Sequence, residues 1–225
     1  MPARPDRFDV AYRERTPLNP EHLFLMPVFL HVGCGQNTKV RTTRALNTPD
    51  WKELRLDIDP AVTPDIVGSM TDMRAVPDGS VDAIYSSHNI EHLYPHEVPV
   101  ALAEFRRVLK PEGFAIVTCP DLQAVAELIA QDTLTQPAYQ SPAGPISPLD
   151  ILYGHRPALA RGNLFMAHRT GFTLSSLMHT FQAAGFATCA GKRQPPPAYA
   201  LWVLATKQAL QEATLRQLSA MHFPN

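Results

Sequence analysis

Two apolar runs that stop at residues suited to ligand binding constrain this chain more than any other feature. The segment Phe29–Asn37, FLHVGCGQN, ends its apolar run at Gly33 and Gly35. Glycines directly after a buried strand let the backbone turn sharply and approach a ligand closely. The next run, within Leu54–Pro60, stops at Asp57, whose two carboxylate oxygens can accept from the paired hydroxyls of a ribose. Together the two segments predict the nucleoside-binding edge of an open α/β sheet.

Further along the chain, apolar runs with strand and helix periodicity alternate, as in a sheet covered by helices. Strands are expected within Asp65–Ser69, Asp78–Ser87 and Phe114–Pro120, and a helix is expected to carry Leu102, Phe105, Val108 and Leu109. The block His88–Leu93, HNIEHL, directly follows the strand expected within Asp78–Ser87. The order of these blocks favours a ligand-binding α/β enzyme.

With these blocks the chain resembles the class I S-adenosylmethionine-dependent methyltransferases, in particular their small bacterial type 11-like family. The motifs that carry the resemblance are GCG at 33–35, LDID at 56–59, SHNIEHL at 87–93 and RRVLKPEG at 106–113. The resemblance implies a Rossmann-like α/β fold: a mostly parallel seven-stranded sheet with helices on both faces and one antiparallel closing strand. It also implies in-line transfer of a methyl group from S-adenosylmethionine to a small-molecule acceptor, with S-adenosylhomocysteine as product.

The resemblance also implies roles for residues on the expected sheet edge. Gly33, Cys34 and Gly35 match the loop that faces the methionine part of the cofactor. Asp57 matches the residue that holds the ribose, and Ile58 matches its apolar neighbour against the adenine ring. The remaining matches are Met70, Thr71 and Asp72 at the adenine edge, and Ser87 and His88 beside the sulfonium.

Three positions depart from the family pattern. Many members have an acidic residue at the position of His31, a third glycine at Asn37 and an aspartate at Ser69. Asn tolerates a left-handed backbone, so the glycine loop is expected to survive the second change. A hydroxyl is a weaker acceptor than a carboxylate, and Asp72 is the expected substitute for the acceptor that Ser69 lacks.

Histidines are the candidate general bases, because their pKa lies near neutrality. His88 is the first choice, His168 the second and His92 the third, and an acceptor that is already nucleophilic needs no base. The acceptor itself is expected to meet a cationic cluster, which contains His155, Arg156, His168 and Arg169.

The expected organisation is one methyltransferase domain over residues 1–225, with an N-terminal arm at 1–27 and an insertion or lid at 121–171 that forms part of the acceptor site. Within the insertion, a helix is expected over Leu122–Ile129. Thr133–Pro148 carries four prolines and is expected to be a loop outside the core. A helix over Phe172–Phe181, strands at Phe186–Ala190 and Tyr199–Ala205 and a terminal helix over Gln208–Met221 complete the expected fold.

Composition limits the partners that the chain can have. The formal net charge is −1, which argues against a nucleic-acid-coating surface. No stretch is typical of an export signal or a membrane span, so we expect a cytoplasmic protein with no membrane contact. Cys34, Cys119 and Cys189 are expected to be reduced, buried thiols rather than a disulfide framework. A homodimer is compatible with the sequence but is not indicated by it.

Alternative interpretations belong to other functional classes. HNIEH is an H-x-x-E-H motif, so a zinc hydrolase with a third ligand from His155 or His168 competes, although our main interpretation assigns no metal. A nicotinamide-dependent oxidoreductase is disfavoured because Thr38 occupies the sixth position of the G-x-G-x-x-G pattern. The departures at His31, Asn37 and Ser69 motivate a third alternative, a catalytically silent nucleoside-binding protein.

Overall fold

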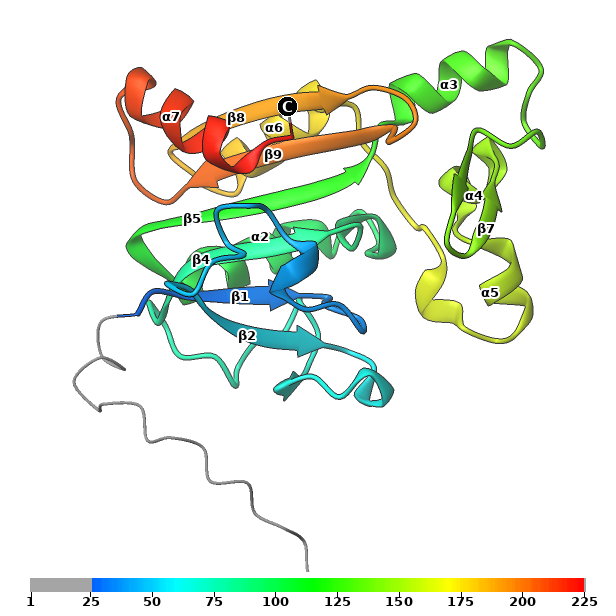
Figure 1. The fold of residues 1–225 in the computed structure, drawn as a ribbon. Coiled ribbons are helices and arrows are strands. Elements are labelled where there is room, and N and C mark those ends of the chain that lie inside the picture. The colour runs from blue at the N-terminus through cyan, green and yellow to red at the C-terminus, as the bar shows by residue number, and fades with distance from the viewer. Residues whose placement is uncertain (1–25, 225) are drawn as a thin grey trace, which may run out of the picture.

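A computed structural model describes residues 26–224, and a seven-stranded sheet forms its centre (Figure 1). The strand order is β3-β2-β1-β4-β5-β9-β8. Among these strands β9 alone runs opposite to the other six, which confirms the fold class predicted from the sequence. The strands are β1 (Val28–Val32), β2 (Lys52–Asp57), β3 (Ile66–Val67), β4 (Val81–Ser87), β5 (Leu109–Pro120), β8 (Thr188–Gln194) and β9 (Ala200–Thr206). The expected arm at 1–27 lies outside the described residues, apart from Met26 and Pro27.

The register of the central strands aligns the ends of β1, β2 and β4. Val32 pairs with Leu56 on β2 and with Ser86 on β4. The residues that follow these three, Gly33, Asp57 and Ser87, therefore leave the sheet at one edge. In Figure 1 the arrowheads of β1 and β2 point toward this edge. The carboxyl edge of parallel strands is where open α/β sheets bind ligands.

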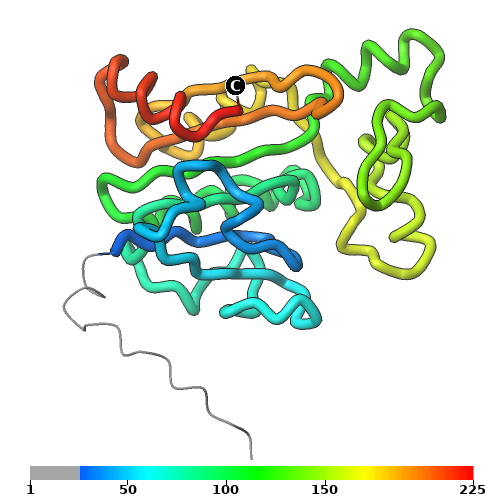
Figure 2. Tube along the Cα trace, in the orientation of Figure 1, coloured from blue at the N-terminus to red at the C-terminus, as the bar shows by residue number. Residues whose placement is uncertain are grey.

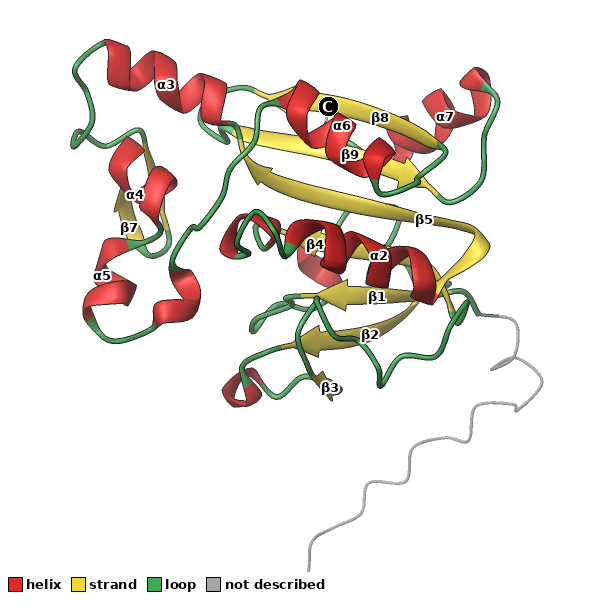
Figure 3. Ribbon diagram, turned by 180° about the vertical axis from the view of Figure 1, so that it is seen from behind, coloured by secondary structure: helices red, strands yellow, loops and turns green. Residues whose placement is uncertain are grey.

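Helices cover both faces of the sheet. α2 (Val98–Val108) and α6 (Leu174–Ala183) lie on one face (Figure 3), and α7 (Glu212–His222) lies on the other. The buried residues of α2 recur at the three- and four-residue spacing of an amphipathic helix: Val98, Ala101, Leu102, Phe105 and Val108. In β5, every residue from Gly113 to Pro120 is buried, as expected for a strand covered on both faces.

A group of short elements stands beyond the carboxyl edge of the sheet (Figure 2). It contains α3 (Leu122–Ala130), the hairpin of β6 (Tyr139–Ser141) and β7 (Gly144–Ile146), α4 (Pro148–Tyr153), α5 (Arg156–Ala160) and the 3-10 helix η4 (Leu164–Met166). The remaining 3-10 helices are η1 (Lys39–Arg41), η2 (Pro60–Val62) and η3 (Ile90–His92). The expectation of a loop over Thr133–Pro148 was wrong in part, because residues 139–146 form a hairpin and Ile146 packs with Val125 and Ile151 in a small core.

Element ends differ from expectation where tertiary pairing or capping decides them. β8 continues to Gln194 instead of ending at Ala190, because it pairs with β9 along its whole length. α6 begins at Leu174, since Thr173 forms a capping box with Ser176. The terminal helix begins at Glu212 and not at Gln208.

The H-x-x-E-H segment does not form the α-helix that a zinc motif requires. His88 has φ +55°, and only Ile90–His92 form the short helix η3. His88 and His92 therefore do not share the face of one α-helix. The three cysteines are free thiols; Cys34 and Cys119 are buried as predicted, whereas Cys189 is only half-buried, so its predicted burial was wrong.

Candidate active site

The glycine loop after β1 is held in a left-handed conformation. Gly33 has φ +64° and Gly35 has φ +53°, a region that residues with a Cβ rarely adopt. Gly33 N donates to Leu56 O at 2.8 Å. A Cβ on Gly33 would overlap the side chain of Asn89, whereas a Cβ on Gly35 would meet no atom within 4 Å. Gly33 thus allows close packing inside the protein, and Gly35 borders open space.

Asp57 connects the ends of β1 and β2. Its Oδ2 accepts from Gly35 N at 2.7 Å, and its Oδ1 accepts from Asp59 N at 2.9 Å. The residue is 8% exposed. Because a carboxylate has about four lone-pair sites, each oxygen of Asp57 keeps one for a further donor.

Arg55 ties the glycine loop to the segment after β2. Its guanidinium donates to the backbone oxygens of Gly35 at 2.6 Å, Asn37 at 3.1 Å and Thr63 at 3.0 Å. The sequence analysis did not assign a role to Arg55, and no local pattern marks it, because its partners lie on two loops that only the fold brings together.

His31, one of the departures from the family pattern, lies under this loop and has its own partner. It is 3% exposed, and its Nδ1 lies 2.7 Å from Glu53 Oε1. Burial lowers the pKa of His31, although the neighbouring Glu53 opposes the shift. Glu53 Oε2 also accepts from Lys39 N at 2.9 Å, so Glu53 links His31 on β1 to the segment that follows the glycine loop.

A first cavity of about 330 Å³ opens at this edge of the sheet. It brings together eight of the residues predicted to bind the cofactor: Gly33, Cys34, Gly35, Asp57, Ile58, Met70, Ser87 and His88. Asn37 and Ser69 also line it. Thr71 and Asp72, which were predicted at the adenine edge, do not. Thr71 Oγ1 bonds with Ser69 Oγ at 2.7 Å, and Asp72 forms an ion pair with Arg74 at 2.6 Å.

A second cavity of about 260 Å³ lies beside the first, between the sheet edge and the elements beyond it. His88, His92 and Met166 line both cavities. Apolar and aromatic side chains form much of the wall of the second cavity, including Pro120, Ile146, Tyr139 and Tyr199. The rings of Tyr139 and Tyr199 stack with centroids 6.3 Å apart.

His88 stands where the two cavities meet. Its N donates to Thr118 O at 2.9 Å, which fixes the backbone at the left-handed φ of +55°. Its side chain is half-exposed, and its Nδ1 lies 3.4 Å from Glu91 Oε1. The sequence analysis placed His88 at this strand end.

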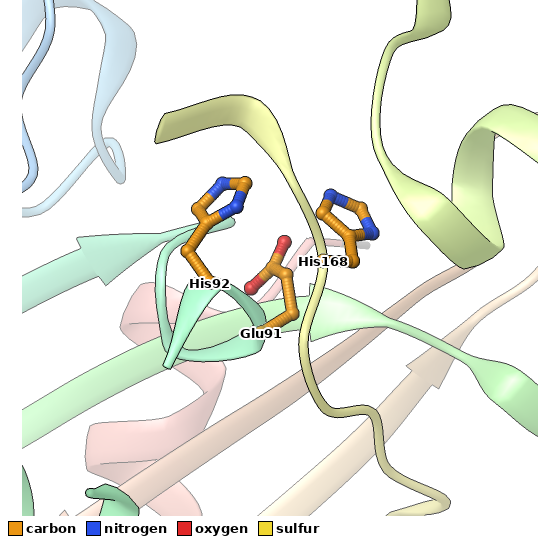
Figure 4. Close-up of side chains that lie close together, drawn as sticks. All are labelled: Glu91, His92 and His168. Carbon is orange, nitrogen blue, oxygen red and sulfur yellow. The ribbon is translucent and has the colours of Figure 1, made fainter. Parts of the chain in front are cut away.

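His92 and His168, the other two candidate bases, lie together with Glu91 (Figure 4). One ligand atom from each of the three residues lies within 4.8 Å of the others. The imidazole centroids of His92 and His168 are 4.9 Å apart. Burial alone would raise the pKa of Glu91, but the facing rings of His88, His92 and His168 lower it.

Backbone contacts hold this group in place. His92 Nδ1 donates to Ala167 O at 3.0 Å, and His168 Nδ1 donates to Ile151 O at 2.7 Å. Arg169 N donates to Glu91 O at 2.8 Å. The segment that carries His168 is therefore fastened both to η3 and to α4.

The predicted acceptor-binding residues are not all in one place. His155 and His168 line the second cavity, and Arg169 lines the first. Arg156 lines neither cavity; its Nε lies 2.8 Å from Asp150 Oδ1. Arg169 places its guanidinium 4.8 Å from the centre of the Tyr94 ring.

Asn89 is a further site residue that the sequence analysis did not identify. Its Nδ2 donates to Ser87 O at 2.9 Å and to Val32 O at 3.1 Å, and so joins the ends of β1 and β4. In the sequence, only its position directly after His88 could have indicated that Asn89 belongs to the site.

Comparisons with known proteins favour one of the interpretations that the sequence left open. A sequence profile described as a methyltransferase domain matches residues 30–117, which span β1 to β5 and include the whole glycine loop, Asp57 and His88. Over these residues the chain is similar to a methyltransferase domain, and its fold is that of the class I S-adenosylmethionine-dependent methyltransferases. The match supports an enzyme that uses S-adenosylmethionine, and it disfavours the oxidoreductase and hydrolase alternatives.

Solved methyltransferase structures share the fold at low sequence identity. One is the Burkholderia thailandensis 1,6-didemethyltoxoflavin-N1-methyltransferase with bound 1,6-didemethyltoxoflavin and S-adenosylhomocysteine (TM-score 0.53, 15% identity, 84% of this chain and 74% of that chain). Another is a SAM-dependent methyltransferase from Archaeoglobus fulgidus (TM-score 0.54, 12% identity, 83% and 90%). A third comes from a Haloferax volcanii complex that contains the Trm112 methyltransferase activator (TM-score 0.54, 13% identity, 84% and 88%). No curated protein matches the chain in sequence.

The methyltransferase domain carries no helix, within residues 26–224, that is long and apolar enough to cross a membrane. The expected location and the expected domain limits stay predictions, and no oligomeric state is assigned.

Proposed function

We propose that this methyltransferase acts on a small-molecule acceptor that binds in the second cavity, and that the cofactor binds in the first. The observation that carries this proposal is the shared wall of the two cavities, at His88, His92 and Met166. Methyl transfer requires the nucleophile and the methyl carbon to meet in line, so the two ligands need adjoining sites with an opening between them.

The first cavity fits the cofactor in size and in chemistry. A cavity of about 330 Å³ is within the usual range for small-ligand sites. Asp57 keeps acceptor positions for the ribose hydroxyls, and Gly35 borders the open space that the methionine part needs. Ile58, 49% exposed at the cavity, offers an apolar surface to an adenine ring.

S-adenosylmethionine supplies a methyl group on a positively charged sulfur. The glycine loop, with Cys34 between its glycines, orients the methionine part, while Ser87 and His88 lie at the reactive end. Ser69 and Met70 are the residues available at the adenine edge, since Asp72 is paired with Arg74 outside the cavity. The acceptor nucleophile approaches from the side of His88.

His88 is the proposed general base for an acceptor that must lose a proton. It is the half-exposed histidine on the shared wall, and its backbone is fixed by Thr118 O. His92 and His168 are less suited to this role, because both are less exposed than His88, and His168 lines only the second cavity. His155 on the wall of the second cavity and Arg169 on the wall of the first are the proposed acceptor contacts.

Calorimetric titration with S-adenosylhomocysteine tests the cofactor assignment. Asp57→Asn should weaken binding by about 2 kcal/mol, or about 30-fold, because a charged acceptor for two hydroxyls is lost. Asp59→Asn is the matched control: it removes a carboxylate two residues away, while its amide oxygen can still accept from Ala61 N. NAD serves as the comparator ligand and should not bind.

Two outcomes would contradict the proposal. The first is wild-type protein that does not bind S-adenosylhomocysteine. The second is equal weakening by Asp57→Asn and Asp59→Asn, which would mean that removal of either charge, and not the contact of Asp57 with the ribose, lowers the affinity.

A further inference from the structure

Glu91 is the least compensated polar side chain near the active site. It is 1% exposed, and neither carboxylate oxygen has a hydrogen-bond partner among the described residues. The nearest cation candidate, His88 Nδ1, is 3.4 Å away, which is too long for a good hydrogen bond. A buried carboxylate without partners costs several kcal/mol, and buried charges are normally paired or bound to a metal. Something that the protein itself does not provide should therefore complete this site.

Each of the two histidines beside Glu91 keeps one ring nitrogen free of hydrogen bonds to the described residues. His92 Nδ1 and His168 Nδ1 each donate to a backbone oxygen, so in the neutral rings Nε2 carries the lone pair. Metal-binding histidines almost always use their other ring nitrogen in this way, because the bond fixes the tautomer and the ring orientation. Figure 4 shows the two rings on either side of the Glu91 carboxylate.

The spacing fits one ion. The three ligand atoms lie within 4.8 Å of one another. In the tetrahedral coordination usual for zinc, ligand atoms lie about 2.0 to 2.2 Å from the ion and about 3.4 Å from one another. Closing the set around an ion thus needs its farthest pair to approach by at most about 1.4 Å, a distance that side-chain rotation can cover. Hydrogen bonds from Arg169 N and Thr170 N to Glu91 O hold the segment that carries His168 beside the segment that carries Glu91.

We propose that Glu91, His92 and His168 bind a divalent transition-metal ion, and that this ion binds a hydroxyl oxygen of the acceptor in the second cavity. This inference rests on the proposed function and deepens it, because it narrows the acceptor to an oxygen nucleophile. Two imidazoles and one carboxylate favour an ion such as Zn²⁺, Mn²⁺ or Co²⁺ over Mg²⁺, which prefers oxygen ligands. Three protein ligands leave open positions for the acceptor.

The position of the ligands suits this role. Glu91, His92 and His168 all line the second cavity, and His92 also lines the first. An ion at this place would hold the acceptor oxygen beside the opening to the cofactor. It would also lower the pKa of the hydroxyl, as bound metal ions do for water.

The transfer step then balances without a further reactant. The acceptor O–H gives its proton to the imidazole of His88, and the oxygen donates an electron pair to the methyl carbon. The carbon–sulfur bond breaks with its electron pair on sulfur, so the sulfonium charge disappears and S-adenosylhomocysteine leaves. No group is oxidised or reduced.

Metal binding can be measured without any methylated product. Purified protein is freed of metal with a chelator, and then Co²⁺ is titrated with visible absorption and Zn²⁺ with calorimetry. Wild-type protein should bind one equivalent per chain. Glu91→Gln and His168→Ala should each weaken binding by at least about 100-fold, because even changes outside the ligand set cost about 10- to 100-fold.

His155→Ala is the matched control. His155 lines the same cavity but does not belong to the group of three, so this variant should bind the metal like wild type. Acetohydroxamate, which binds metal ions through two oxygens, should change the absorption of Co²⁺ in the wild-type protein. An unchanged spectrum would overturn the assignment of the acceptor oxygen to the ion.

Titration with S-adenosylhomocysteine separates the possible failures. Every variant that folds should keep its affinity for this ligand, and if Glu91→Gln does not fold, His168→Ala decides. Wild-type protein that binds S-adenosylhomocysteine but no metal refutes the metal site alone, and so does metal binding that neither substitution weakens. Wild-type protein that does not bind S-adenosylhomocysteine would instead refute the proposed function on which the inference rests.

Discussion

Substitution of Gly33 by alanine tests how the sheet edge is built. The change places a Cβ at φ +64°, which costs about 1 kcal/mol, and it displaces the side chain of Asn89. The amide of Asn89 has two N–H donors, and its two shortest bonds are to Ser87 O at 2.9 Å and to Val32 O at 3.1 Å. Losing both costs about 2 kcal/mol. Gly33→Ala should therefore lower the free energy of unfolding by about 3 kcal/mol.

Gly35→Ala is the matched comparison, because it has the same left-handed backbone but meets no atom within 4 Å. It should lower the free energy of unfolding by only about 1 kcal/mol. Asn89→Ala should cost about 2 kcal/mol, and the double variant Gly33→Ala/Asn89→Ala should cost about 3 kcal/mol instead of the additive 5 kcal/mol.

Urea unfolding followed by circular dichroism measures all four variants. The difference of about 2 kcal/mol between additive and observed values is the energetic signature of the Gly33–Asn89 contact. Equal destabilisation by Gly33→Ala and Gly35→Ala, or strict additivity in the double variant, would refute the argument that Gly33 is needed for packing against Asn89.

The remaining predictions concern the buried histidine of α7 and the arginine behind the glycine loop. Burial lowers the pKa of His222 to about 4, so below pH 6.5 the unfolded state binds a proton that the folded state does not. The contribution of His222 to the free energy of unfolding is complete above pH 6.5, and it should be about 2 kcal/mol smaller at pH 5 than at pH 7.5. His222→Gln should remove this loss, whereas the control His179→Gln, at an exposed position, should not. Urea unfolding at both pH values measures the difference. Arg55→Gln should weaken S-adenosylhomocysteine binding about tenfold, because the glycine loop loses its guanidinium donors. Calorimetry measures the affinity, and Arg41→Gln, at an exposed position, is the control. Unchanged affinity in Arg55→Gln, or an equal loss in both variants, would contradict this role of Arg55.

The central sheet and its ligand edge were predictable because their signals are local. An apolar run that stops at Gly33 and a run that stops at Asp57 each mark the end of a buried strand. Parallel pairing then places both ends at one edge without further information, as the register of Val32 with Leu56 confirms. The antiparallel strand β9 was identified for the same reason, from its own apolar run.

Contacts that join distant segments were not predictable in this way. Arg55 meets the backbone of two loops, and Asn89 joins two strands, so neither has a pattern in its own neighbourhood. The hairpin at 139–146 was missed because four prolines in Thr133–Pro148 favour a loop. Its pairing uses three residues a side, and Pro145 lies on β7 opposite Gln140.

The motif HNIEH shows most directly how one sequence pattern supports two geometries. As an α-helix it would place His88 and His92 on one face, with Glu91 as a base for water. The bond from His88 N to Thr118 O instead turns the chain into a left-handed conformation, which separates His88 from the short helix that follows. Glu91 is thereby buried as a partner for metal and not as a base, and the missing imidazole comes from His168, on a segment held by Ile151 O and Glu91 O. Because that imidazole comes from a distant segment, the motif alone could not identify the ligands. His88, which the motif assigns to metal, is instead available to take the acceptor's proton.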